Sequence, residues 1–236
     1  MPHSKQPNYL VASTWTGADK TNARTITIID TYKEVFGSSI PFNRHYWTMC
    51  GAHFDINLNP VHGELNQLLD TSLIEKPQFC GVDREVTIIE KNKKLYPLIQ
   101  WFHGDFYETM ESAAIRGDFN PAIINYDGVM QPRYGAQYII KIFKLLDRMF
   151  EGEVLLITNF VLANPYNGSE KVTYTIEETL DIIITSHKFP DHWSVLPFAY
   201  TYGGYSKLSN AQMGVLGFVK KRHEIRKMRY SSNREV

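Results

Sequence analysis

The sequence has few cysteines, no excess of either charge and no long apolar run. Two cysteines in 236 residues exclude a disulfide framework, and the first thirty residues lack the pattern of a secretory signal. Both features favour a reducing, cytoplasmic compartment. Equal numbers of basic and acidic residues, 25 of each, leave no global field that would draw the chain onto nucleic acid or an anionic membrane. The longest mainly apolar stretches, such as 153–163, fall short of the ~20 residues that a membrane span needs, so we predict no membrane partner.

Internal repeats and low-complexity tracts are also absent, which excludes fibrous and disordered proteins. Hydrophobic residues make up 43% of the chain and aromatic residues 13%, which is enough for one sizeable core. Short apolar runs alternate with stretches of helical period. This order is typical of an α/β domain with a mainly parallel sheet.

Seven apolar runs have the length and composition of strands. The predicted strands are 46–50, 78–82, 98–103, 122–126, 153–159, 193–200 and 212–219. The link between the last two is short, rich in Gly, Tyr, Ser and Asn, and without helical period. We therefore predict that these two strands form an antiparallel hairpin.

Apolar residues at helical spacing predict the crossover helices between the strands. The predicted helices are 60–70, 85–96, 134–150 and 175–186. Thr175 and Glu178 have the spacing of a capping box at the start of the last one. The four helices and seven strands together predict one domain.

The predicted domain spans residues 46–219, with a segment on either side. Residues 1–45 contain one candidate helix, 22–36, and are predicted to pack on the sheet as an N-terminal extension. Residues 220–236 form a basic C-terminal tail with seven Lys and Arg against two Glu, and tyrosines precede it. Basic and aromatic residues together are compatible with nucleic-acid binding, and a solvated, frayed end is the alternative.

Small and acidic residues follow the first two predicted strands, at the edge where open parallel sheets bind ligands. Cys50, Gly51 and Ala52 form a small-residue turn after the first strand, where a ligand could approach the backbone closely. Asp83 follows the second strand. Its carboxylate can accept hydrogen bonds from both hydroxyls of a ribose.

The next two strands also end in polar residues. Asp105 follows the third strand and can accept a hydrogen bond from an exocyclic amine, while the ring of Phe106 can stack on a base. Asn125, Tyr126 and Asp127 stand at the end of the fourth strand. Three successive acidic strand tips are more specific than any one of them.

With these residues the chain resembles the class I S-adenosylmethionine-dependent methyltransferases over roughly 46–219. Residues 79–83, followed by a helix with the charged run 90–94, are similar to the family's second strand and its acidic cofactor residue. The resemblance implies a Rossmann-like, doubly wound seven-stranded sheet, mostly parallel with a reversed last strand. It also implies methyl transfer from S-adenosylmethionine to an unidentified acceptor, with nucleic acid as one candidate. The oligomeric state stays open.

The resemblance assigns roles to the residues at the strand ends. The implied cofactor-binding residues are Cys50, Gly51, Ala52, Asp83, Asp105, Phe106 and Asn125. Tyr126 and Asp127 are the predicted catalytic residues, because either could act as a base or orienting group for an acceptor that loses a proton. The sequence departs from the family in its first turn, which lacks the glycine-rich pattern. Residues 125–128 also lack the Asp/Asn-Pro-Pro-Tyr of enzymes that methylate exocyclic amines of bases, which disfavours that chemistry.

Each of these residues has a structural alternative. Asp83 and Asp105 each precede a helical pattern and could be helix N-caps. Phe106 could belong to the core, Tyr126 and Asp127 could form a turn before a glycine, and Cys50 could be a buried, unreactive thiol.

Two other functions are open to a chain of this kind. A nicotinamide-dependent oxidoreductase should carry Gly-x-Gly-x-x-Gly after its first strand, and residues 50–55 lack it. A non-catalytic binding or scaffolding protein is the other alternative, supported by the irregular first turn. His53 and Asp55 have the spacing of a metal-binding pair, but no third ligand lies at supporting spacing, so we predict no metal site.

Overall fold

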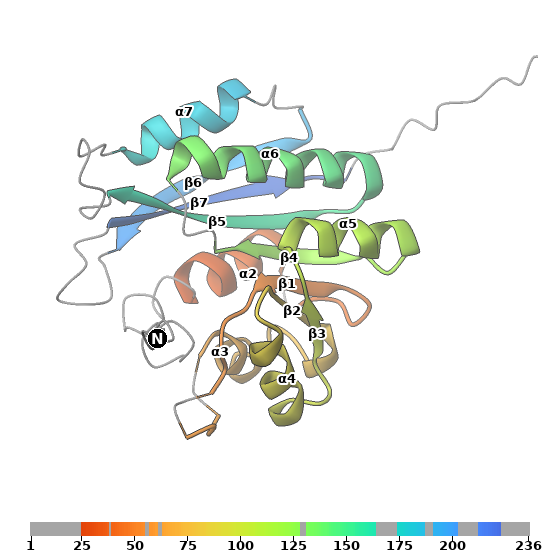
Figure 1. Ribbon diagram of the computed structural model, residues 1–236. Helices are drawn as coiled ribbons and strands as arrows, with labels where there is room; N and C mark the ends of the chain where they lie inside the picture. Colours follow the sequence, from red (N-terminus) through yellow and green to blue (C-terminus); the bar gives the residue numbers. More distant parts are fainter. Residues whose placement is uncertain are drawn as a thin grey trace, which may run out of the picture.

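Seven strands form one mixed sheet in the order β3-β2-β1-β4-β5-β7-β6 (Figure 1). This is a computed structural model, which describes residues 25–37, 39–54, 57–60, 63–127, 131–163, 174–186, 191–202 and 212–222. The strands are β1 His45–Met49, β2 Phe79–Asp83, β3 Gln100–His103, β4 Pro121–Tyr126, β5 Val154–Ala163, β6 Trp193–Tyr202 and β7 Gln212–Lys220. All seven predicted strands are confirmed, with ends that differ by at most four residues.

The first five strands run parallel, and the last one in sequence is reversed. β1 pairs in parallel with both β2 and β4, β3 extends the sheet beyond β2, and β5 extends it beyond β4. β7 lies antiparallel between β5 and β6. The predicted antiparallel pairing of the last two strands is therefore confirmed, and the Rossmann-like sheet with a reversed last strand is the observed fold class.

Helices cover both faces of the sheet (Figure 1). One face carries the π-helix η3 Thr25–Asp30 with α2 Thr31–Phe36, α3 Glu64–Asp70 and α4 Val86–Leu95, while the short turn η4 Lys76–Gln78 leads into β2. The other face carries α5 Phe106–Arg116, α6 Pro132–Met149 and α7 Ile176–Ser186. The predicted capping box at α7 is confirmed, since Glu178 N donates to Thr175 Oγ1 at 3.1 Å and Thr175 N donates to Glu178 Oε2 at 2.7 Å.

Each face of the sheet has its own apolar core. Alternate residues of a strand point to opposite faces, so Tyr46 of β1 joins the core beneath α3 and α4, while Trp47 joins the core beneath α5 and α6. The apolar stripe of α6, including Ile139 and Phe143, is completely buried in the second core. These two cores fix which strand residues reach each side of the sheet.

The ends of the described chain pack against the sheet. Ile28, Ile29 and Tyr32 are buried in the first core, so the segment that contains η3 and α2 lies on the sheet. The predicted helix at 22–36 is found from Thr25 onward, and the preceding residues lie outside the described part.

At the other end, β7 continues through Lys220, one residue beyond the predicted strand. The Lys220 side chain is buried, and its Nζ donates to the Phe150 carbonyl at 2.6 Å. Residues 223–236, which hold most of the basic segment, lie outside the described residues. The domain boundaries at 45 and 219 remain predictions. Within the described part of the chain, every helix is too short or too polar to cross a membrane.

Candidate functional site

The carboxyl ends of β1 and β4 mark the switch point of the sheet. The chain leaves β1 for α3 on one face and leaves β4 for α6 on the other, while the two strands pair side by side with Thr48 opposite Asn125. Ligands of open α/β sheets bind in the crevice outside such a switch point. The structure therefore brings the turn at 50–52 beside the segment 125–127, which are two of the groups that the sequence predicts.

Glu64 supplies a buried carboxylate beneath this switch point. It is the first residue of α3, and its side chain is 5% exposed. The Tyr46 hydroxyl donates to Glu64 Oε1, Thr48 Oγ1 lies 3.3 Å from the same oxygen, and Asn125 Nδ2 donates to it at 2.6 Å. The carboxylate thus joins β1, β4 and α3. The sequence analysis did not single out Glu64, because a charged residue in the first turn of a helix usually faces solvent.

Asn125 has a further acceptor that receives no hydrogen bond from the described residues. Its side chain is 3% exposed, and the contact of Nδ2 with the Glu64 carboxylate fixes the orientation of the amide. The opposite atom, Asn125 Oδ1, is buried and has no hydrogen-bond partner among the described residues. A buried carbonyl without a donor costs about 1–3 kcal/mol. A bound group that donates a hydrogen bond would remove this cost.

The first turn is held by the protein backbone and by one side chain of α4. Cys50 N donates to the Val82 carbonyl at 3.0 Å. Asn92, which is completely buried, donates from Nδ2 to the Gly51 carbonyl and accepts from His53 N, both at 3.1 Å. Asn92 thus holds the turn in a fixed shape without the family's glycine-rich pattern. Sequence reasoning missed it because it lies in the middle of a helix.

Cys50 is a buried thiol and not a candidate nucleophile. Its side chain is 5% exposed. Burial, and then the nearby carboxylates of Asp83 and Glu64, raise the pKa of the thiol well above its usual value, so it stays protonated. The alternative of an unreactive thiol is supported. The same effect indicates that the first turn lies in a negative potential.

Asp83 ends β2 and is half-buried at the same edge. Its Oδ1 accepts from Glu85 N at 2.8 Å. The N-cap of α4 is Glu85, so the alternative that Asp83 caps the helix is wrong, and its carboxylate instead closes the turn before the helix. Burial raises the pKa of Asp83 to about 6, although hydrogen bonds from the backbone oppose the shift. This strand tip therefore carries a carboxylate whose charge is poorly solvated.

Asp105 is the N-cap of α5, as the structural alternative predicted. Its Oδ1 accepts from Tyr107 N at 2.9 Å and from Glu108 N at 3.2 Å, and its Oδ2 forms an ion pair with Arg84. Burial opposes ionisation, but the bonds from Arg84 and from the backbone outweigh it and lower the pKa of Asp105. Both oxygens therefore already have protein partners. Sequence reasoning missed Arg84 because its partner, Asp105, follows β3, the next strand along the chain.

Phe106 and Tyr126 pack together in the second core. Phe106 is 3% exposed, Tyr126 is 2% exposed, and their ring centroids lie 5.9 Å apart. Tyr126 also stacks on Tyr138 with the planes 15° apart. Burial raises the pKa of Tyr126, so its hydroxyl stays protonated at neutral pH. Such a group can orient an acceptor by hydrogen bonding, but it is a poor base.

Asp127 is the more accessible of the two predicted catalytic residues. It is half-buried just after β4, and its Oδ1 accepts from Asn159 Nδ2 of β5 at 3.2 Å. Asn159, which the sequence analysis did not identify, thus connects a third strand to the edge. Residues 128–130 lie outside the described residues, so the predicted turn there stays a prediction.

His53 and Asp55 are the two residues with the spacing of a metal-binding pair. Asp55 lies outside the described residues, and the described residues contain no group of three or more His, Cys, Asp or Glu that could hold a metal ion.

The chain was compared with known proteins. No protein-family model matches it, and no curated protein matches its sequence. Among solved structures, it is similar to the plantazolicin methyltransferase BamL, determined in complex with a triazolic desmethylPZN analog and SAH (S-adenosylhomocysteine). Identity is 14%, the TM-score is 0.50, and 87% of this chain and 88% of that chain are covered.

A second similar structure is a candidate S-adenosylmethionine-dependent methyltransferase from Streptococcus mutans. Identity is 10%, the TM-score is 0.50, and the match covers 86% of this chain but 49% of that one. Identities of this size establish the fold alone. Together with the strand order 3-2-1-4-5-7-6 and the reversed β7, they show that this chain has the fold of the class I S-adenosylmethionine-dependent methyltransferases.

Proposed function

We propose that this protein binds S-adenosylmethionine at the carboxyl edge of β1, β2 and β4 and transfers its methyl group to an acceptor. The observation that carries the proposal is the half-buried carboxylate of Asp83 at the tip of β2, beside the switch point of a sheet with the methyltransferase strand order. The cofactor supplies an electrophilic methyl group on a positively charged sulfur. The residues of the chain must hold it and orient the acceptor.

Asp83 is the proposed partner of the ribose. A carboxylate accepts several hydrogen bonds, so the bond from Glu85 N leaves capacity for two hydroxyl groups. The raised pKa of Asp83, about 6, supports this role, because added donors would stabilise a charge that burial leaves poorly solvated.

The methionine end of the cofactor fits the negative potential at the first turn. Asp83 and Glu64 both raise the pKa of Cys50, so a cation is favoured beside the segment that includes Gly51 and Ala52. Asn125 Oδ1 supplies an acceptor that has no partner among the described residues. An ammonium group and a sulfonium group complement these features. The negative potential and the acceptor of Asn125 would together hold the methionine end without a glycine-rich turn.

The adenine end is proposed to lie near Asp105 and Phe106. Asp105 would accept one more hydrogen bond while it keeps its role as helix cap. Phe106 would support the site from the core, because only 3% of its side chain is exposed. We therefore expect the adenine contacts to contribute less than Asp83.

Asp127 is the proposed proton acceptor, and Tyr126 the proposed orienting group. Asp127 is half-buried, while the phenol of Tyr126 is fixed by stacking and stays protonated. Methyl transfer depends mainly on the alignment of two reactants, so these two groups suffice for an acceptor that must lose a proton. The acceptor stays unidentified in this proposal, with nucleic acid bound through 220–236 as one candidate, and the proposed location is the cytoplasm.

Calorimetry at pH 7.5 with S-adenosylmethionine, S-adenosylhomocysteine and NAD tests the proposal. We expect the first two to bind and NAD not to bind. Asp83→Asn should weaken S-adenosylmethionine about 10- to 150-fold, the value of a charge-assisted hydrogen bond, while its amide oxygen still accepts from Glu85 N.

Asp118→Asn is the matched control. This variant also removes one negative charge. Asp118 lies just after α5, is exposed and pairs with Arg116, so the affinity for the cofactor should stay the same. Absence of binding by both adenosyl compounds would refute the proposal and favour the non-catalytic alternative. Equal losses in the two variants would refute the role of Asp83.

A further inference from the structure

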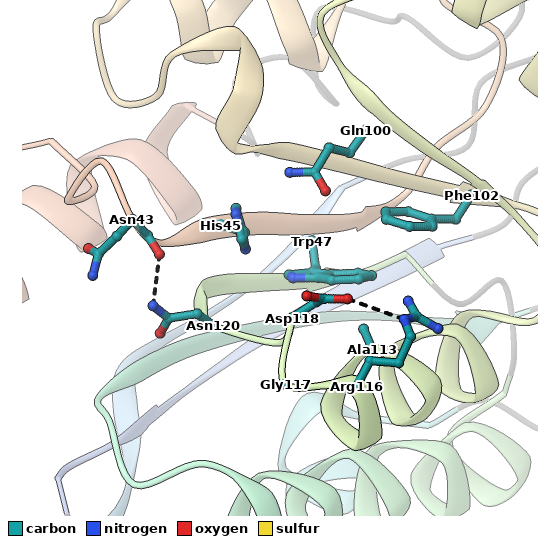
Figure 2. A pocket seen from close by; sticks show the side chains of 10 residues that line it. All are labelled: Asn43, His45, Trp47, Gln100, Phe102, Ala113, Arg116, Gly117, Asp118 and Asn120. Atoms are coloured by element: carbon teal, nitrogen blue, oxygen red, sulfur yellow. Dashed lines mark hydrogen bonds and ion pairs between the residues drawn. The ribbon is translucent and has the colours of Figure 1, made fainter.

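A cavity of about 370 Å³ lies at the opposite edge of the sheet, where β1 and β3 begin (Figure 2). Its walls include His45 and Trp47 of β1, Gln100 and Phe102 of β3, and the segment that follows α5. This volume falls at the lower end of the range for small-molecule sites. None of the residues assigned to the proposed cofactor site lines it.

Trp47 carries a hydrogen-bond donor that has no acceptor among the described residues. Its side chain is 1% exposed, and its indole nitrogen has no hydrogen-bond partner among the described residues. The other two tryptophans in the described part differ, because Trp101 Nε1 donates to the Tyr96 carbonyl at 3.1 Å and Trp193 Nε1 donates to Asp147 Oδ1 at 2.8 Å. An indole nitrogen can only donate. A group that satisfies Trp47 must therefore be an acceptor.

His45 contributes a second unpaired ring nitrogen on the same face of the same strand. His45 Nδ1 is buried and has no partner among the described residues. Figure 2 shows the nitrogen end of the Trp47 indole on the side of the cavity where His45 lies. His45 and Trp47 are two positions apart on β1, with only Tyr46 between them, so both side chains reach the same wall.

The cavity carries no net charge. Arg116 Nε and Asp118 Oδ2 form an ion pair at 3.2 Å, and both side chains are more than half exposed at its rim. Burial lowers the pKa of His45, although Asp118 opposes the shift, so the imidazole is neutral at neutral pH. The described lining residues offer no unpaired cation to a phosphate or a carboxylate. An uncharged ligand suits this wall better.

An aromatic surface completes the cavity. The rings of Trp47 and Phe102 stack with centroids 5.3 Å apart and planes 15° apart. Their edges border the cavity next to the amide of Gln100, which is anchored by a bond to the Pro77 carbonyl at 2.9 Å. Flat rings pack well against such surfaces. The lining thus combines aromatic ring edges with neutral hydrogen-bonding groups.

We propose that this cavity binds a nucleoside, whose uncharged, planar base accepts a hydrogen bond from the Trp47 indole and a second polar contact from His45. A nucleobase combines a flat apolar face with hydrogen-bond acceptors on its edge. This site lies at the amino edge of the sheet and does not depend on the proposed methyl transfer.

An NMR titration of the indole N–H signals with uridine and with adenosine tests the site. We expect the Trp47 signal to move and saturate with either nucleoside, while the Trp101 and Trp193 signals stay in place. Uridine has no adenine, so its effect is independent of the proposed cofactor site. No movement of the Trp47 signal with millimolar uridine, or movement with inorganic phosphate instead, would overturn the proposal.

Trp47→Phe provides the second test, because it keeps an aromatic ring and removes only the donor and part of the ring. It should weaken uridine roughly 3- to 10-fold, as expected for one neutral hydrogen bond. The melting temperature without ligand should fall less than in Trp193→Phe, which breaks the bond to Asp147. Equal falls in both variants would mean that the Trp47 indole already has a partner, which would overturn the proposal.

Discussion

The two edges of the sheet bury charges of opposite sign. At the carboxyl edge, Glu64 and Asp83 are buried or half-buried carboxylates beside the ends of β1 and β2. At the amino edge, Arg44 donates to the carbonyls of Pro121 and Glu153, and Lys220 donates to the carbonyl of Phe150. The cations at the amino edge therefore hold loops together.

The difference indicates where each kind of ligand can bind. At the amino edge Arg44 and Lys220 donate to main-chain carbonyls, and the buried groups without a partner among the described residues include Arg44 Nε and the ring nitrogens of Trp47 and His45. At the carboxyl edge the buried groups without a partner among the described residues include the acceptor Asn125 Oδ1, and the carboxylates of Asp83 and Glu64 lie near the first turn. The carboxyl edge thus suits a cation, and the cavity at the amino edge suits an uncharged acceptor.

Removing the carboxylate of Glu64 should have the largest effect on stability. Glu64→Ala would leave Tyr46, Thr48 and Asn125 without their shared acceptor, which should lower the free energy of unfolding by about 3 kcal/mol or more. Glu64→Gln keeps one acceptor oxygen and should lose much less. Urea denaturation measures both values, and an alanine variant as stable as the parent would contradict the buried network.

Lys220 should make stability rise with pH. Burial lowers its pKa to about 8 from 10.5, so the folded state releases its proton before the unfolded state does. Stability should therefore increase between pH 8 and 10.5, by roughly 2–3 kcal/mol relative to Lys220→Met. Parallel stability curves for the two proteins across this window would show that the lysine is not buried as described.

Asp83, at the carboxyl edge, should instead make stability fall as the pH rises. Its folded-state pKa, about 6, lies above the ordinary value of 3.8, so its ionised form destabilises the fold above that window. Asp83→Asn should be more stable than the parent at pH 7.5, by roughly 1–2 kcal/mol after allowance for partial exposure. The gain should disappear as the pH falls from 6 to 4. A variant that is less stable at pH 7.5 would contradict the poorly solvated carboxylate.

Of these residues, Asp105 should have the smallest effect on the free energy of unfolding. Its bonds to Tyr107 N and Glu108 N cap α5, so Asp105→Ala should lose about 1 kcal/mol. Asp105→Asn keeps the cap and loses only the ion pair with the exposed Arg84, a smaller effect. Thermal unfolding at pH 7 separates the two variants. A loss in the asparagine variant as large as in the alanine variant would assign the stabilisation to the ion pair instead.

The sequence predicts the features of this fold that depend on neighbouring residues. The strands and crossover helices follow from alternating apolar runs and helical periods, and the cap at Asp105 follows from local chemistry. The strand tips at Asp83 and Asn125 were found because they directly follow apolar runs. Their positions, but not their partners, could be predicted.

The partners depend on contacts between distant segments. Asn125 meets Glu64 across 61 residues, and Asn92 holds a turn about 40 residues before it. No local pattern distinguishes a buried Glu64 from a solvated one. Likewise, the burial of Phe106 against Tyr126 is decided by the packing of α5 on β4.

An NMR titration of backbone amides with S-adenosylhomocysteine tests the central claim most directly, because it reports both edges of the sheet in one experiment. The account predicts saturable shifts at residues 50–52, 83, 104–106 and 125–127, and none at 43–47 or 116–120 beyond those of a buffer control. Shifts confined to the amino edge, or no shift at either edge, would contradict the assignment of the carboxyl edge as the cofactor site.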